Sequence, residues 1–368
     1  MARTNPKHQF FDQAAGRQPL TYRDSVPDTQ SSASLYNFRR QLRIAGRYAT
    51  PDFRRSALQL LCTILPLAGL WTAMALTVEN AYWLTLLLSL PTSAFLVRLF
   101  MIQHDCGHRS FFRSRRLNDF LGHAIGMLTL TPHGYWRRAH NIHHATSGNL
   151  DKRGIGDLHV LTVREYQALS RWKRLAYRIY RNPIVLFGFG PLYIFVIKFR
   201  LPLDMLRRQR AALPSVLTTN LVIVGAIAGL SLWLGFTEAL MVQGPIVFMS
   251  SVAGVWLFYI QHQFENTSWR RNEEWDFDEA AIRGSSFYDL PPVLGWLTAD
   301  IGIHHIHHLS SRIPNYRLRE CLRENVELQN ADRITLLASF RCVFLALWDE
   351  GTDRLVSFKS LSRSQPSA

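Results

Sequence analysis

The stretch Ser56–Leu76, SALQLLCTILPLAGLWTAMAL, runs for 21 residues without a charged side chain. A helix of this length spans about 30 Å, which is the thickness of the hydrocarbon core of a bilayer. Three more stretches of similar length are equally or nearly as apolar, namely Tyr82–Gln103, Val216–Phe236 and Ala239–Gln261. Buried helices of soluble proteins rarely run so long without a charge. The sequence therefore predicts four transmembrane helices in an all-α integral membrane protein.

The four stretches fall into two pairs, each joined by a short connection. Thr77–Ala81 separate the first pair, and Thr237 and Glu238 separate the second pair. Neither connection contains Lys or Arg, whereas arginines gather at the other ends of the stretches. These arginines are Arg39, Arg40, Arg43, Arg47, Arg54, Arg55, Arg109, Arg113, Arg115, Arg116, Arg207, Arg208, Arg210, Arg270 and Arg271. By the positive-inside rule we predict two helical hairpins with both termini and residues 105–214 in the cytoplasm.

The strongly basic composition has two competing explanations, nucleic-acid binding and membrane orientation. The net charge is +15, and only five of the 42 basic residues are lysines. No zinc-finger spacing, RNA-recognition signature or basic-zipper heptad accompanies them, so we predict no nucleic-acid partner. Four cysteines in 368 residues exclude a disulfide scaffold. The polar first 50 residues contain no cleavable signal, and the thiols are expected to be reduced.

We expect three parts along the chain. Residues 1–50 form a polar cytoplasmic N-terminal segment, residues 51–320 a membrane-embedded domain with a cytoplasmic helical cap, and residues 321–368 a cytoplasmic C-terminal tail. Two apolar segments inside the domain are ambiguous: residues 183–199 contain two Gly and two Pro, and residues 117–131 are too short to span. We interpret both as re-entrant or interfacial segments.

Histidines carry the clearest chemical signal. Eight of the 14 histidines stand in three clusters whose spacings of three and four place side chains on one face of a helix. The clusters are His104 and His108 in QHDCGH, His140, His143 and His144 in HNIHH, and His304, His307 and His308 in HHIHH. His262, directly after the fourth stretch, is a ninth candidate. Because nine imidazoles at one membrane face are more than one ion needs, we predict two metal ions. Imidazole ligands suit iron, zinc, copper and nickel, so the ligand type alone does not identify the metal.

Carboxylates beside the clusters are candidates for orienting the ligands and offsetting the metal charge. They are Asp105, Asp151, Asp157, Glu265 and Asp300. The remaining histidines near the clusters fall outside the spacing and are interpreted as hydrogen-bonding or packing residues. These are His123, His133, His159 and His305, and His8 in the polar N-terminal segment is assigned no role.

The three clusters and their flanks resemble the histidine boxes of the membrane-bound fatty acid desaturases. QHDCGHRSFF is similar to the first box, WRRAHNIHHATSGNLDKRG to the second, and DIGIHHIHHLSSRIPNYRL to the third. The flanks are most similar to the bacterial omega-6, or delta-12, acyl desaturase branch. The resemblance extends from about Gln59 to Leu318, with hairpins and boxes in the same order.

The resemblance implies an oxidoreductase that uses O2 and two external electrons to insert a double bond into a long-chain fatty acyl group. It implies two iron ions, cycling between Fe2+ and Fe3+, held by the eight box histidines, with His262 as the ligand outside the boxes. The acyl substrate would be linked to a lipid, to CoA or to a carrier protein. Because the chain has no His-Pro-Gly-Gly haem motif, electrons are expected from a separate ferredoxin or cytochrome-type donor. The expected location is the cell (inner) membrane, if the protein is bacterial.

Two other function classes remain open at this point. The first is a histidine-box hydroxylase or ketolase acting on a fatty acyl, alkane or carotenoid substrate, which no residue distinguishes from a desaturase. The second is a histidine-rich metal transporter or sensor, which predicts ionisable residues along a path inside the spans. Three of the four stretches contain no charged residue, and the histidines stand at the ends, which disfavours transport.

Overall fold

A computed structural model describes residues 39–154, 156–201 and 210–362. The chain divides into two compact units, Met1–Arg40 and Gln41–Ala368. Almost all of the first unit, including His8, lies outside the described residues, as do residues 202–209 and 363–368. The fold described below is therefore that of the second unit.

Four long helices correspond to the four apolar stretches. They are α2 (Phe53–Thr77), α3 (Tyr82–His108), α10 (Leu213–Leu234) and α11 (Phe236–His262), and all four are long and apolar enough to cross a membrane. The prediction of four spans in a mostly helical protein is confirmed. The helix α3 continues five residues past the predicted Gln103 and α11 one residue past the predicted Gln261, so His104, His108 and His262 still belong to helices.

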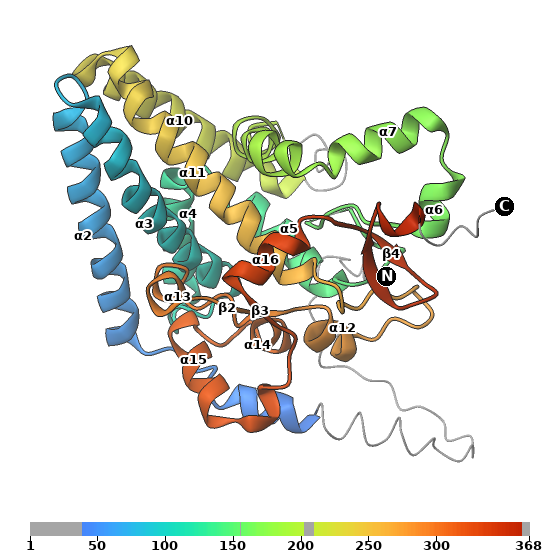
Figure 1. Ribbon diagram of the computed structural model, residues 1–368. Helices are drawn as coiled ribbons and strands as arrows, with labels where there is room; N and C mark the ends of the chain where they lie inside the picture. Colours follow the sequence, from blue (N-terminus) through green and yellow to red (C-terminus); the bar gives the residue numbers. More distant parts are fainter. Residues whose placement is uncertain (1–38, 155, 202–209, 363–368) are drawn as a thin grey trace, which may run out of the picture. The chain divides into compact units, whose positions relative to one another are not determined.

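Local chemistry fixes the ends of these helices. Asp52 caps α2 by accepting a hydrogen bond from the backbone N–H of Arg55 at 2.9 Å. The helix α3 ends where Arg109 adopts a left-handed conformation with φ of 57°. Gly235, with φ of 93°, makes the tight turn between α10 and α11, a conformation that L side chains rarely adopt. The two hairpins pack side by side, with α3 between α2 and α11 (Figure 1).

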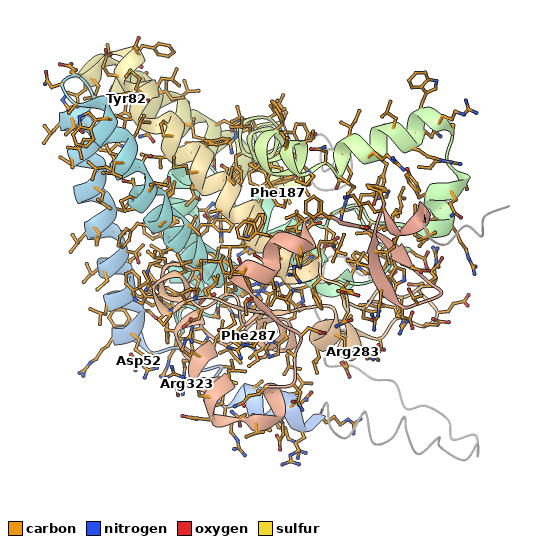
Figure 2. All side chains as sticks on the ribbon, in the orientation of Figure 1. Asp52, Tyr82, Phe187, Arg283, Phe287 and Arg323 are labelled. Atoms are coloured by element: carbon orange, nitrogen blue, oxygen red, sulfur yellow. The ribbon has the colours of Figure 1, made fainter. Side chains whose placement is uncertain are left out.

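The outer faces of the spans are apolar. Figure 2 shows Tyr82 at the end where the hairpin α2–α3 turns and Asp52 at the opposite end. Leucines on the outer faces of the spans are exposed, including Leu58, Leu65 and Leu221. Such exposure of apolar side chains is what a lipid-facing surface requires, because lipid tails are themselves apolar. The chain therefore builds a bundle with an apolar outside and places its polar elements beyond one end.

Helices and short strands follow α3 and α11 and form a cap, defined here as these elements: α4 (Arg115–Leu128), α5 (His133–Thr146), α6 (Val163–Ala168), α12 (Phe277–Arg283), α13 (Pro292–Leu297), α14 (His304–Leu309), α15 (Asn315–Glu324) and α16 (Leu336–Cys342). Within the described ranges five strands join them: β1 (Leu161–Thr162), β2 (Phe287–Asp289), β3 (Arg333–Thr335), β4 (Leu345–Asp349) and β5 (Arg354–Ser357). Short 3-10 turns are η3 (Arg210–Ala212), η4 (Val326–Leu328) and η5 (Ser360–Ser362).

The strands tie the end of the chain into the cap. They form a three-stranded sheet in the order β1-β4-β5 and a parallel pair of β2 with β3. In both, a strand from residues 321–368 pairs with a strand from earlier in the chain. The segment interpreted as a tail is thus integrated with the membrane-embedded domain, although the boundary near residue 320 stays a prediction.

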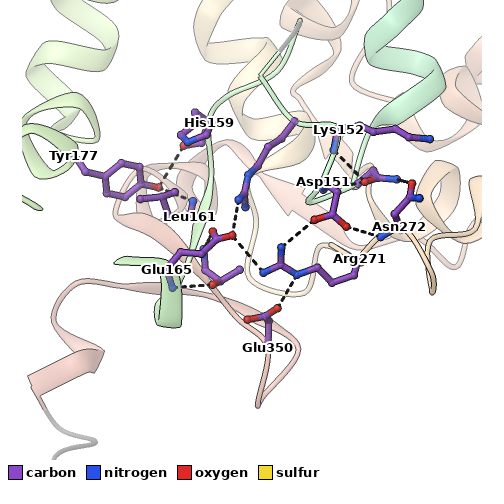
Figure 3. A network of polar contacts seen from close by, with 12 residues as sticks. Asp151, Lys152, His159, Leu161, Glu165, Tyr177, Arg271, Asn272 and Glu350 are labelled. Atoms are coloured by element: carbon purple, nitrogen blue, oxygen red, sulfur yellow. Dashed lines mark hydrogen bonds and ion pairs between the residues drawn. The ribbon is translucent and has the colours of Figure 1, made fainter. Parts of the chain in front are cut away.

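A polar network seen in Figure 3 connects the loop that carries Arg271 to two other loops and one helix of the cap. The guanidinium of Arg271 contacts the carboxylates of Asp151 at 3.0 Å, Glu165 at 3.3 Å and Glu350 at 3.1 Å. These acids come from the loop after α5, from α6 and from the turn between β4 and β5. Because its acids are partly exposed, the network contributes modestly to stability and mainly fixes the relative positions of the loops.

The two ambiguous apolar segments do not form straight spans. The segment 117–131 lies in the 14-residue helix α4 and the turn after it. The segment 183–199 forms two π-helical elements, η1 (Val185–Phe189) and η2 (Tyr193–Lys198), around the short α8 (Gly190–Leu192). It is bent by 58° from the preceding α7 (Arg171–Tyr180).

Candidate metal centre

The nine candidate histidines come from four helices that end or lie at one end of the bundle. His104 and His108 occupy the last two turns of α3, and His262 is the last residue of α11. Since α3 and α11 are each the second helix of a hairpin, their C-terminal ends meet at the same end of the bundle. The helices α5 and α14 supply the other six, which are His140, His143, His144, His304, His307 and His308.

The structure sorts the nine side chains into two groups. The five-histidine group is His104, His108, His140, His144 and His307, and the four-histidine group is His143, His262, His304 and His308. Within each group one nitrogen from each ring lies within 4.8 Å of all the others. All four members of the four-histidine group are buried, whereas three members of the five-histidine group are only half-buried.

Single ring nitrogens in each group have more close nitrogen neighbours than they can hydrogen-bond. Nε2 of His140 lies 3.0 Å from Nε2 of His104, 3.0 Å from Nε2 of His108 and 3.1 Å from Nε2 of His144. Nε2 of His262 lies 3.1 Å from that of His143 and 3.0 Å from that of His304. A neutral ring nitrogen offers one proton or one lone pair, so it can satisfy only one of these neighbours.

Protonation of the rings does not account for these close contacts. Burial, reinforced by the neighbouring imidazoles, lowers the pKa of five group members well below the usual range, two of them in α5 and three in α14. This holds for His140, His144, His304, His307 and His308. Neutral rings then point several lone pairs at one place. Imidazoles about 2.1 Å from a shared cation have nitrogens roughly 3.0–3.4 Å apart, so the donor set fits one metal ion in each group.

Hydrogen bonds on the outer ring nitrogens hold three of these imidazoles. Nδ1 of His143 donates to Asp157 at 3.1 Å, and Nδ1 of His262 donates to the carbonyl of Gly284 at 2.9 Å. Nδ1 of His104 lies 3.3 Å from the carboxylate of Asp105. Such partners fix the ring tautomer so that Nε2 presents its lone pair to the centre of the group.

A buried chain of hydrogen bonds continues outward from Asp105. Its carboxylate accepts from the backbone N–H of Asn315 at 2.7 Å and from the side-chain amide at 2.8 Å. The carbonyl oxygen of that amide accepts from Gln59 of α2 at 2.7 Å. The chain therefore links a candidate ligand on α3 to the starts of α15 and α2.

Of the five acids considered in the sequence, two face ligand candidates and three do not. Asp105 and Asp157 have the contacts described above. Asp151 pairs with Arg271, Glu265 with Arg354 at 3.2 Å, and Asp300 with Arg319. For these three the structure shows arginine ion pairs in place of contacts with the two groups.

The neighbouring histidines have other surroundings. His305 is buried, and its Nε2 donates to the carbonyl of Leu328 at 2.8 Å. His133 is buried with its ring centroid 5.1 Å from that of His123. Neither His123 nor His159 belongs to the two groups. His305 is thus a hydrogen-bonding residue and His133 packs against His123, while the role of His159 stays a prediction.

Several supporting residues were not identified from the sequence. Trp136 stacks on His140 with ring centroids 4.6 Å apart, and Phe258 lies 5.1 Å from the ring of His143. Gly156 has φ of 73°, and a Cβ there would lie 2.6 Å from the carbonyl oxygen of Ala139. Only glycine allows this close passage, which brings the next residue, Asp157, beside His143. Asn315 lies in the Pro-Asn-Tyr sequence after the third box, which by itself does not indicate a contact with Asp105.

An apolar cavity of about 570 Å³ leads to both groups. His104, His140 and His304 stand in its wall, and the rest of the wall comes mainly from α3, α11 and residues 185–199. Phe100, Leu257 and Phe189 are typical of the lining. A cavity with this lining admits an apolar chain and excludes water from the space in front of the histidines.

Comparisons with known proteins agree with this geometry. The sequence profile of the fatty acid desaturase family matches residues 80–336. A fatty acid desaturase of Bacillus subtilis is 46% identical over 314 residues, which cover 85% of this chain and 89% of the relative. A Synechocystis sn-1 oleoyl-lipid 12-desaturase is 27% identical over 264 residues, covering 69% of this chain and 66% of the relative. A Synechocystis sn-1 acyl-lipid omega-3 desaturase (ferredoxin) is 29% identical over 238 residues, covering 60% and 61%.

Replacing Asn315 with Ala should weaken metal retention without unfolding the chain. The substitution removes the side-chain donor to the buried carboxylate of Asp105, which then holds His104 less firmly. Loss of a partner that orients a ligand typically lowers metal affinity by about 10–100-fold. Metal content per protein after dialysis against a graded series of chelator concentrations measures the change. Asn325→Ala is the matched control, because Asn325 follows the same helix but contacts Tyr48 and Cys321. Equal metal retention in all three proteins would contradict the role of Asn315.

Proposed function

This chain belongs to the fatty acid desaturase family, a membrane-bound family of oxidoreductases acting on fatty acyl chains, and we propose that it is a di-iron desaturase acting at the delta-12/omega-6 position. The observation that carries the proposal is the position of two groups of converging imidazoles at the end of an apolar cavity. The overall reaction would convert two neighbouring methylenes, O2, two electrons and two protons into a double bond and two water molecules.

Each histidine group would hold one ion. The five-histidine group would bind the first and the four-histidine group, with His262, the second. Iron is supported by the all-imidazole donor set and by the desaturase family. When bound, the two irons with O2 supply the oxidising power that removal of hydrogen from an unactivated methylene needs.

The chain's own residues bind and position the substrate. The lining of the cavity binds the acyl chain by apolar contact and keeps bulk water away from the reacting carbons. His104, His140 and His304 open into the cavity, so carbons that lie against them are the ones presented for reaction. Asp157 and the carbonyl of Gly284 keep His143 and His262 in fixed orientations, which the reaction requires because small displacements are costly in rate.

The relatives favour desaturation over the alternatives left open by the sequence. The names of the relatives given above describe desaturases, including an oleoyl-lipid 12-desaturase, which supports the delta-12 position. They also disfavour a metal transporter or sensor. By the same reasoning the acyl group would be part of a lipid, with CoA and carrier-protein esters as alternatives.

The orientation in the membrane and the electron donor belong to the same proposal. The positive-inside rule supports a cytoplasmic cap in the cell membrane. Two exposed arginines stand beside half-buried members of the five-histidine group in the chain, Arg109 directly after His108 and Arg138 two residues before His140. We expect an acidic ferredoxin, or a cytochrome-type donor, to dock on these arginines, since one relative is named as ferredoxin-dependent.

Expression in a host that makes monounsaturated but no polyunsaturated fatty acids tests the reaction. We expect new diunsaturated chains in total lipid, with the second double bond located at the delta-12 position by mass spectrometry. The chain carrying His143→Ala is the negative control. A new hydroxyl or keto group in place of a double bond would transfer the protein to the alternative class of oxygenase.

His143→Ala should abolish turnover and lower bound iron while the protein still inserts into the membrane. His143 belongs to the fully buried four-histidine group, so its loss removes a ligand that no water can replace with the same geometry. Iron and zinc per protein, measured by mass spectrometry, and activity are compared with the His159→Ala control, in which an exposed histidine outside both groups is changed. Full activity of a protein that holds stoichiometric zinc and no iron would disprove the di-iron mechanism.

Reduction by an acidic donor should slow as ionic strength rises. Salt screens the attraction between the donor and the exposed arginines beyond about 8 Å at physiological ionic strength. Stopped-flow reduction of the iron-loaded protein by a reduced ferredoxin at increasing salt measures the effect, and Arg138→Glu should lower the rate further than Arg323→Glu on α15. A rate that does not depend on salt would remove this surface as the docking site.

A further inference from the structure

A second apolar space, here called the outer groove, lies on the other side of residues 183–190 from the histidine cavity. Its volume is about 580 Å³. Pro183, Ile184, Phe187 and Gly188 form one side, and Phe248, Met249, Val252, Ala253 and Trp256 of α11 form the other. All nine lining residues are apolar, and they belong to a span and to the apolar segment beside it. The outer groove thus opens toward the bilayer rather than toward water.

One thin layer of chain separates the outer groove from the histidine cavity. Along α11, Val247, Ser250 and Gly254 line the cavity, while neighbouring positions such as Phe248 and Ala253 line the groove. The same alternation occurs in residues 183–190, here called the wall segment, where Leu186 and Phe189 face the cavity, and Phe187 faces the groove. Movement of the wall segment by the width of a side chain would join the two spaces.

The outer face of the wall segment is loosely packed. A Cβ added to Gly188 of the wall or to Gly254 of α11 would meet no atom within 4 Å. The backbone of the segment is π-helical, a conformation that is rare and is concentrated at functional sites. Ile184 is 73% exposed and Phe189 is 65% exposed. Close packing is therefore weak on the outer face of the wall segment, whereas Leu186, which is only 6% exposed, packs in the core with Tyr259.

The end of the outer groove nearest the cap lies beside two amphipathic helices. Phe187 contacts Trp256 with ring centroids 5.0 Å apart, and Trp256 contacts Phe340 of α16 at 5.2 Å (Figure 2 labels Phe187). Leu337 of α16 is 80% exposed, and Arg341 follows Phe340 on the surface. The helix α7, which leads into the wall segment, exposes Trp172 together with basic neighbours. Exposed apolar side chains flanked by arginine and lysine are typical of helices that lie in the headgroup region of a membrane.

We propose that the outer groove binds one acyl chain of a membrane phospholipid and that the wall segment opens to pass this chain into the histidine cavity. The proposal rests on the proposed function in that the chain delivered is the one to be desaturated. The route is favourable because an acyl chain moves from lipid to groove to cavity without exposing its methylenes to water. The arginine and lysine side chains of α7 and α16 would meet the phosphate of the same lipid.

Photolabelling of the full-length protein in vesicles tests the binding step. The probe is a phosphatidylglycerol with a diazirine in one acyl chain, diluted into phosphatidylcholine vesicles. Peptide mapping should find label on Phe248–Trp256 and on the wall segment at several times the level found on the exposed face of α10 around Leu221. Label should also appear on Phe100 of α3, which lines only the cavity. Equal labelling of α10 and the outer groove would overturn the proposal.

Blocking the groove tests the passage step. Ala253→Trp should lower the label on Phe100 and the turnover of bilayer lipid several-fold, with bound metal unchanged. Ala228→Trp is the matched control on the exposed face of α10 and should change neither quantity. Ala253→Leu provides a smaller obstruction if the tryptophan variant does not fold. Undiminished label on Phe100 in a folded, blocked variant would show that the chain enters elsewhere. Because labelling requires neither metal nor turnover, its outcome is independent of whether the protein is a desaturase.

Discussion

The convergence of nine imidazoles in a mostly buried space is the constraint on which the rest of the structure depends. Their nitrogens approach one another to about 3 Å, and the number of these close contacts exceeds the number of hydrogen bonds that the rings can form. The ligand candidates come from α3, α5, α11 and α14, which are separated by up to two hundred residues. The two hairpins solve this problem because the second helix of each ends at the same side of the bundle. Cap elements then bring α5 and α14 over these ends, and hydrogen bonds to Asp105, Asp157 and the Gly284 carbonyl hold the rings.

The site and the fold are consequently difficult to separate. The hydrogen-bonded chain from His104 through Asp105 and Asn315 to Gln59 runs through the packing of α2, α3 and α15. The loop that carries Asp157 depends on the glycine before it, and the neighbouring loop is held by Arg271. A metal ion in each group would add its binding free energy to the stability of this arrangement, because the ligands converge only in the folded chain.

The sequence predicted the parts of the molecule whose signal is local. Apolar length gave the four spans, and helical spacing gave the histidine clusters, because both patterns lie within a single element. The five strands are only two to five residues long and carry no measurable periodicity. Asp151 and Asp157 both follow the second box closely in sequence, yet Asp151 pairs with Arg271 and Asp157, the more distant of the two, with His143. That difference is produced by a turn at Gly156 and by an arginine 120 residues away, which no local pattern contains.

The arrangement of access routes follows from the same constraint. His104, His140 and His304 open into the cavity between the spans, whereas His108 and His144 of the five-histidine group are half-buried on the side of the arginines. An apolar chain and an electron donor, as proposed, would then reach the centre from different directions and would not compete for one opening. This separation matters for a reaction in which water must stay out while electrons come in. A route through the outer groove would keep the substrate side closed to water at every stage, since the wall segment would open toward lipid and the donor would bind where the histidines are already partly exposed.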